Sequence, residues 1–118
     1  MTVQNLYDSL GADYESVYKR IPNETIIKKL ILMFPADKSL SELNKAIDDG
    51  DYKAAFIAAH TLKGVSLNLG LTPISEISSD ITEILRSGNC ADSITPLLKK
   101  LNNACNDAID LINSSSLK

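Results

Sequence analysis

The sequence predicts an all-α protein, an antiparallel up-down-up-down four-helix bundle with short additional helices at its N-terminal end. Apolar residues recur at spacings of three and four along almost the whole chain, and no run alternates with period two. Aromatic residues make up only 5% of the 118 residues and Trp is absent, so Leu, Ile and Ala must build the core. We expect one domain over residues 1–118, with the core bundle at about residues 23–112.

Three helices are expected first, of which the first two are short, and each begins after a side chain that can cap a helix N-terminus. These segments, with their caps, are 2–10 (Thr2), 13–20 (Asp13) and 24–34 (Asn23). Gly11 should end the first segment, and Pro35 should end the third because proline cannot continue a helix.

Four longer segments follow, and Gly or Pro residues separate them. The segment 39–49 buries one face and ends at Gly50, and 51–69, capped by Asp51, is expected to be the longest clean helix. The next runs to about residue 87, with Thr72 as its cap and Pro73 in its first turn. The last begins between residues 91 and 96 and continues to about residue 112, with Asp92 and Thr95 as alternative caps.

Charge and composition exclude several classes of protein. The net charge is −3 and the basic residues form only isolated pairs, so no basic stripe predicts a nucleic-acid interface. Cys90 and Cys105 have no metal-ligand spacing, and we expect both thiols to be reduced. No signal peptide or membrane-spanning run is recognised at the sequence level, which predicts a cytoplasmic protein.

The segment 51–69 contains the one local departure from helix rules. At about 100° per residue its small and apolar residues form a core face, and His60 lies roughly 140° from that face, so it should point outward. Lys63 and Gly64 follow one turn later on the same side. A glycine inside a helix costs about 1 kcal/mol relative to alanine, so Gly64 marks a candidate site where a partner needs space.

Three apolar residues share the outward sector with the histidine: Phe56, Ile57 and Leu67. Apolar side chains around an exposed ionisable group predict a docking surface. Two alternatives remain open from the sequence. Phe56 and Ile57 could pack under the short N-terminal helices, and Leu67 could belong to the edge of the core.

These residue types are suited to phosphoryl chemistry. An exposed imidazole is substantially neutral at pH 7, since the reference pKa of histidine is about 6.5, and a ring nitrogen can then attack phosphorus. Lys63 can offset part of the negative charge that a phosphoryl group brings. No cluster of Asp and Glu accompanies His60, so magnesium and the acidic pocket would have to come from the partner.

The string Ala59-His60-Thr61-Leu62-Lys63-Gly64, followed by Asn68-Leu69-Gly70, resembles the signature of histidine phosphotransfer (HPt) domains. This resemblance implies that His60 is phosphorylated on Nε2, that Lys63 stabilises the phosphoryl charge, and that Gly64 provides steric clearance. It also implies a phosphorelay role in two-component signalling without independent ATP-dependent kinase activity. The chain departs from the family pattern at Leu67, where the family often has Gly or Ala.

The implied partners are receiver domains of response regulators and of hybrid sensor kinases, with Mg²⁺ in the receiver and no cofactor in this chain. We expect a monomer. The alternatives are a binding-only helical adaptor and a phosphotransfer domain excised from a chemotaxis-type or hybrid histidine kinase. An independent enzyme with His60 as general base is disfavoured, because no convergent polar pocket is recognisable near His60.

Overall fold

The structure, a computed structural model, describes residues 1–88 and 92–117. The described chain contains helices and no strand, which confirms the all-α class. The elements are α1 (Val3–Leu10), α2 (Tyr14–Arg20), α3 (Glu24–Met33), the 3-10 helix η1 (Phe34–Ala36), α4 (Ser39–Asp48), α5 (Tyr52–Asn68), α6 (Thr72–Ser87) and α7 (Ile94–Ser114).

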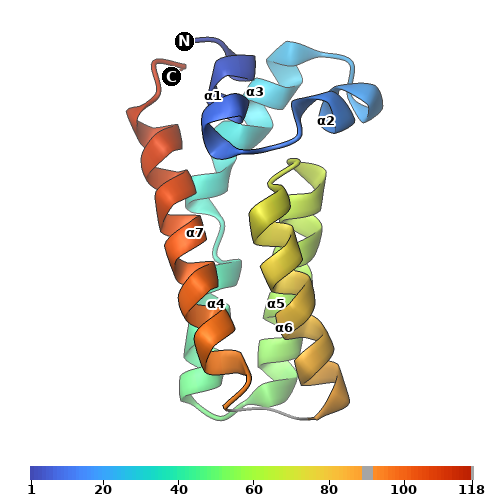
Figure 1. The fold of residues 1–118 in the computed structure, drawn as a ribbon, viewed down its shortest axis with the longest axis vertical. Helices are drawn as coiled ribbons and strands as arrows, with labels where there is room; N and C mark the ends of the chain where they lie inside the picture. Colours follow the sequence, from blue (N-terminus) through green and yellow to red (C-terminus); the bar gives the residue numbers. More distant parts are fainter. Residues whose placement is uncertain (89–91, 118) are drawn as a thin grey trace.

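Helices α4, α5, α6 and α7 lie along the long axis of the molecule, and α1, α2 and α3 gather at one end of it (Figure 1). Helix α5 packs against α4 on one side and α6 on the other, and α6 also packs against α7. Both chain termini lie at the end where α1 to α3 gather (Figure 1). The opposite end holds the start of α5, so most of this helix lies away from the N-terminal segment.

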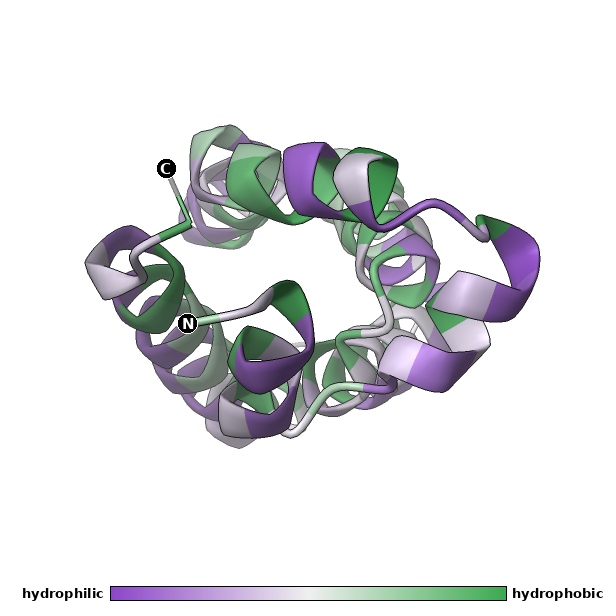
Figure 2. Cartoon of the chain, turned by 90° about the horizontal axis from the view of Figure 1, so that it is seen from above, coloured by the Kyte–Doolittle hydropathy of each residue, from purple (hydrophilic) through white to green (hydrophobic). Residues whose placement is uncertain are grey.

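The core is made mainly of aliphatic side chains, as the composition predicts, and it also holds the ring of Tyr7. Each helix carries both hydrophobic and hydrophilic residues in the view from above (Figure 2). The buried hydrophobic residues form one cluster. Its largest fully buried aliphatic side chains are Leu6, Ile27, Ile31, Leu43, Leu62, Leu71, Ile81, Ile94, Leu101, Ile112 and Val17. Burial of these side chains from every helix supplies the main favourable free energy of folding.

Four predicted caps are confirmed. The side chains of Thr2, Asp13, Asn23 and Asp51 each accept a hydrogen bond from a backbone N–H three residues later, at 3.0–3.2 Å. These bonds satisfy donors that the first turn of a helix otherwise leaves unpaired. The helix starts were therefore predictable from local sequence.

Several predicted boundaries are wrong by a residue or more. Helix α3 ends at Met33, and Pro35 lies inside η1 rather than beyond the helix. Thr72 is the first residue of α6 rather than its cap, and its hydroxyl lies 3.4 Å from the carbonyl oxygen of Gly70. Proline is tolerated in a first turn because its missing N–H has no partner there, so Pro73 does not mark which residue precedes the helix.

Helix α7 also differs from expectation. It starts at Ile94 with Ser93 at the N-cap position, so neither Asp92 nor Thr95 is the cap. Pro96 lies within its first turn, where it leaves the helix uninterrupted. With 21 residues α7 is longer than α5, which has 17, so the expectation that the histidine helix is the longest was wrong. The earliest predicted start, at residue 91, and Cys90 lie outside the described residues.

The N-terminal helices are attached to the C-terminal end of α5. Arg20 of α2 donates hydrogen bonds to the carbonyl oxygens of Leu67 (3.2 Å) and Asn68 (3.0 Å), and to Oδ1 of Asn68 (3.4 Å). A cation at this position pairs with carbonyl groups that lack helical partners and with the negative end of the helix dipole. Arg20 was not singled out from the sequence, because its partner lies in a distant segment.

Candidate functional site

His60 lies near the middle of α5 and is exposed to solvent. The opposite face of the helix is buried, with Ala55, Ala59 and Leu62 at 1% exposure or less. This confirms the predicted orientation of the helix. Ser66 is buried as well, and its hydroxyl donates to the carbonyl oxygen of Leu62 at 2.7 Å, so it belongs to the core face.

Gly64 is exposed one turn after His60, in ordinary helical backbone. A Cβ atom built on it would meet nothing within 4 Å. The packing of this chain therefore gives no reason for a glycine, although alanine would favour the helix. Open space beside the imidazole is the feature that this residue provides.

Lys63 is half-buried, whereas the sequence predicted an exposed side chain. Helical geometry places Lys63 and Phe56 together on one flank of His60, the flank that approaches α6. A lysine stem can lie along apolar surface while its ammonium group stays in water. Within the described part of the chain the Lys63 side chain has no ion pair or hydrogen bond, so its charge is uncommitted.

The three predicted docking residues differ in exposure. Ile57 is 60% exposed and Leu67 is 53% exposed, so Leu67 does not belong to the core edge. Phe56 is half-buried and lines a depression with Leu85 and Arg86 at the end of α6. The alternative that Phe56 and Ile57 pack under the N-terminal helices is wrong, because those helices lie at the other end of α5 (Figure 1).

Phe56 also contacts the histidine. The two rings are nearly parallel, at an interplanar angle of 20°, and their centroids are 6.0 Å apart. The guanidinium group of Arg86 lies over the same phenyl ring, and its central carbon is 5.3 Å from the ring centroid. The structure thus brings Arg86 of α6 against the ring that stacks with His60, and the sequence did not identify this residue.

The charges that α5 itself carries are positive. Lys53 and Lys63 are the only charged residues within α5, and the chain as a whole is acidic. Among the residues that the structure describes, no group of three His, Cys, Asp or Glu side chains could hold a metal ion. A phosphate-bearing or acidic partner would therefore meet a favourable local field at this helix.

A groove of about 750 Å³ lies beside the C-terminal half of α5. Its apolar lining comes from Leu30, Met33 and Phe34 in α3 and η1, and from Val65 and Leu69 at the end of α5. The apolar periodicity of each helix was visible in the sequence, but a groove between two helices depends on their relative placement.

None of the helices in the described part of the chain combines the length and the apolar character that crossing a membrane requires.

Comparison with protein-family models gives one finding. The model described as the Hpt domain matches residues 35–113, which run from η1 through α7 and include α5 with His60. The segment that precedes residue 35, with α1, α2 and α3, lies outside the match. Neither the curated proteins nor the solved structures gave a match to this chain.

Proposed function

This chain belongs to the Hpt domain family, and we propose that it is a phosphorelay intermediate with His60 as its phosphoacceptor. Domains of this family serve histidine phosphotransfer in two-component phosphorelays and interact with receiver domains of response regulators. In the proposed reaction His60 accepts a phosphoryl group from the aspartyl phosphate of one receiver domain. It then passes the group to the aspartate of another, in a response regulator or a hybrid sensor kinase.

One observation carries this proposal. The only histidine of the chain is exposed in the middle of a helix whose other face is in the core, beside a glycine that leaves open space. A rigid helix holds the nucleophile in place, and the missing side chain admits the acidic pocket of a receiver. A solvated histidine without a role would not require Gly64.

The transfer step needs little chemistry from this chain. A lone pair on the neutral ring, which we assign to Nε2, forms a bond to phosphorus as the bond from phosphorus to the aspartyl oxygen breaks. The carboxylate of the receiver leaves, and the reverse step returns the group to a second aspartate. Mg²⁺ bound by the receiver would neutralise charge on the phosphoryl oxygens. We propose that this chain contributes no metal or other cofactor.

The neighbouring residues have separate proposed roles. The uncommitted ammonium group of Lys63 offsets phosphoryl charge, and Gly64 gives clearance. Ile57 and Leu67 contact the receiver through apolar surface that is otherwise exposed to water. The part of the Phe56 ring that is accessible to solvent adds to this apolar contact surface.

We propose further that residues 1–118 act as one cytoplasmic, monomeric unit. Its helices α4 to α7 would form an antiparallel up-down-up-down bundle that supports the histidine on α5. The pairwise packing of α4 with α5, α5 with α6, and α6 with α7 supports this arrangement. The N-terminal helices would then brace the end of α5 through Arg20.

A phosphorylation assay tests the function. The protein is incubated with a phosphorylated receiver domain, and the label is examined for the acid lability and alkali stability of phosphohistidine. We expect labelling that His60→Gln abolishes, whereas Thr61→Ala, a change at the exposed neighbour, retains it. Label that persists in His60→Gln would refute the role of His60. Receiver binding without any label would show a phosphorylation-independent adaptor instead.

A further inference from the structure

A second positive charge lies against the aromatic neighbour of His60, and it comes from α6. Arg86 is in the last turn of that helix, and its guanidinium group lies over the ring of Phe56, 5.3 Å from the centroid. The same ring stacks with the imidazole of His60. Phe56 thus contacts both the proposed nucleophile and an arginine.

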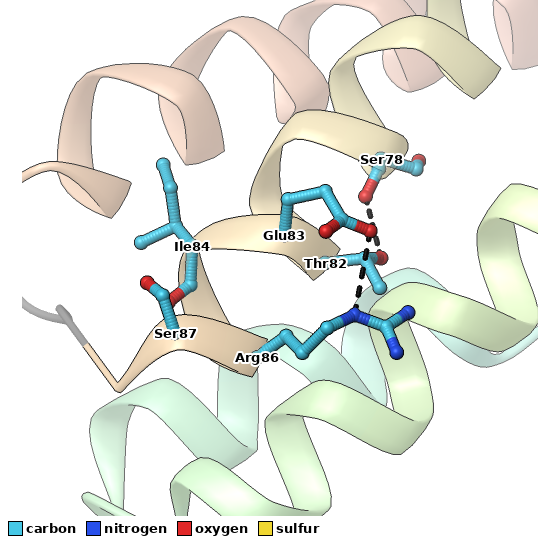
Figure 3. A network of polar contacts seen from close by, with 6 residues as sticks. All are labelled: Ser78, Thr82, Glu83, Ile84, Arg86 and Ser87. Carbon is cyan, nitrogen blue, oxygen red and sulfur yellow. Dashed lines mark hydrogen bonds and ion pairs between the residues drawn. The ribbon is translucent and has the colours of Figure 1, made fainter.

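Arg86 is held only weakly where it lies. Its Nε is 3.4 Å from Oε1 of Glu83, and the two side chains are 56% and 60% exposed. Figure 3 shows these side chains extending from α6 toward one another, while the Thr82 hydroxyl donates to the carbonyl oxygen of Ser78 within the helix. Exposed ion pairs stabilise proteins little, so Arg86 can exchange Glu83 for a stronger anion.

A phosphoryl group on His60 would be such an anion. It carries a charge of about −1.5 to −2 at neutral pH and has three strong acceptor oxygens. Lys63 offers one ammonium group, which offsets only part of that charge. A guanidinium group can donate two parallel hydrogen bonds to phosphoryl oxygens, which a lysine cannot match in geometry.

We propose that Arg86 is a second cation for the phosphoryl group on His60, and that Phe56 is the positioning residue that keeps it available. This inference rests on the proposed function. Before phosphorylation Arg86 lies against Phe56 and Glu83. After phosphorylation it turns from Glu83 to the phosphoryl oxygens and slows hydrolysis of the phosphohistidine.

A purely structural role for Arg86 makes a different prediction. A cation in the last turn of a helix interacts favourably with the carbonyl groups there, and this effect alone could explain the residue. It would affect the stability of α6 in the same way whether or not His60 is phosphorylated. The lifetime of the phosphorylated protein therefore separates the two roles.

The experiment uses phosphoramidate as a small phosphodonor, so that no receiver is involved. The bond from His60 to phosphorus forms as the bond from phosphorus to the donor nitrogen breaks, and ammonia leaves. After donor removal, the half-life of the phosphorylated chain is followed by intact-protein mass spectrometry. We expect Arg86→Gln to shorten the half-life roughly three- to tenfold, and Arg86→Lys to restore part of it.

Three further variants complete the test. Lys99→Gln removes the same charge from an exposed position on α7 and should leave the half-life unchanged. Phe56→Leu should shorten the half-life, and adding it to Arg86→Gln should shorten it no further, because both changes act through one arginine. A half-life in Arg86→Gln equal to that of the parent overturns this inference alone. Failure of the parent chain to become phosphorylated, or label in His60→Gln, would instead refute the proposed function.

Discussion

Gly70 lies directly against the backbone of Asp13. The N–H of Asp13 donates to the carbonyl oxygen of Gly70 at 2.9 Å, and a Cβ on Gly70 would lie 2.7 Å from the carbonyl oxygen of Asp13. In the sequence, Gly70 stands out only because it follows the predicted histidine helix and belongs to the Asn68-Leu69-Gly70 string. The close approach shows a second requirement, since this contact joins the N-terminal helices to the end of the histidine helix.

Gly70→Ala should therefore destabilise the fold strongly. The residue has φ of +72°, which is unfavourable for alanine, and the added Cβ would also collide with backbone. We expect a loss of about 2–4 kcal/mol in the free energy of unfolding, measured by urea denaturation. The matched control is Gly11→Ala, where φ is +64° but the Cβ would meet open space, and the loss should be about 1 kcal/mol. Equal losses in the two variants would contradict the importance of the contact.

Gly64→Ala should have the opposite effect on stability. Its backbone is helical and its surroundings are open, so alanine should stabilise the chain by about 0.5–1 kcal/mol. The added methyl group should nevertheless slow phosphoryl exchange with a receiver, because it fills the space beside His60. Thermal unfolding and receiver exchange measured on the same preparation check this pair of outcomes. Unchanged exchange kinetics would remove the clearance role of Gly64.

Leu67→Ala tests the docking surface. Because Leu67 is 53% exposed, its truncation should change the free energy of unfolding by less than about 1 kcal/mol. It should weaken exchange with the cognate receiver but not labelling by phosphoramidate. Leu62→Ala is the core control, since Leu62 is 1% exposed and its loss should cost about 2–5 kcal/mol. A Leu67→Ala variant with normal receiver exchange would argue that this leucine does not dock.

Alkaline pH should destabilise the protein through Tyr7. Burial raises the pKa of this phenol from its usual 10.0 to about 12. The unfolded chain ionises first as the pH rises, so the stabilising effect is complete below pH 10 and is lost between about pH 10 and 12. Two pKa units correspond to about 2–3 kcal/mol. The melting temperature, measured from pH 8 to 11.5, should fall across this range.

Tyr7→Phe should reduce that dependence on pH. It should cost little at pH 7, because the Tyr7 hydroxyl has no hydrogen-bond partner within the described residues. The buried thiol of Cys105, whose pKa burial raises to about 12, leaves some alkaline dependence in this variant. Tyr18→Phe, on an exposed ring, is the control and should behave as the parent. The same alkaline loss in Tyr7→Phe as in the parent would show that Tyr7 is not responsible.

The local sequence predicted the start of a helix correctly where a nearby side chain caps that helix. Thr2, Asp13, Asn23 and Asp51 were recognised as caps because a capping side chain bonds to a backbone N–H only three residues away. The errors at the starts of α6 and α7 occur where no side chain caps the helix and a proline lies in its first turn. Proline is tolerated within a first turn, so it does not fix which residue begins the helix.

The sequence by itself determined that the chain is helical and that His60 points away from the core beside Gly64, since helical periodicity fixes which residues share a face. Only the tertiary structure decided what surrounds His60. The half-buried position of Lys63 and the approach of Arg86 to Phe56 follow from the way α6 packs against α5. That packing depends on side chains throughout the core, so no short motif could have predicted which residues of α6 lie near the histidine.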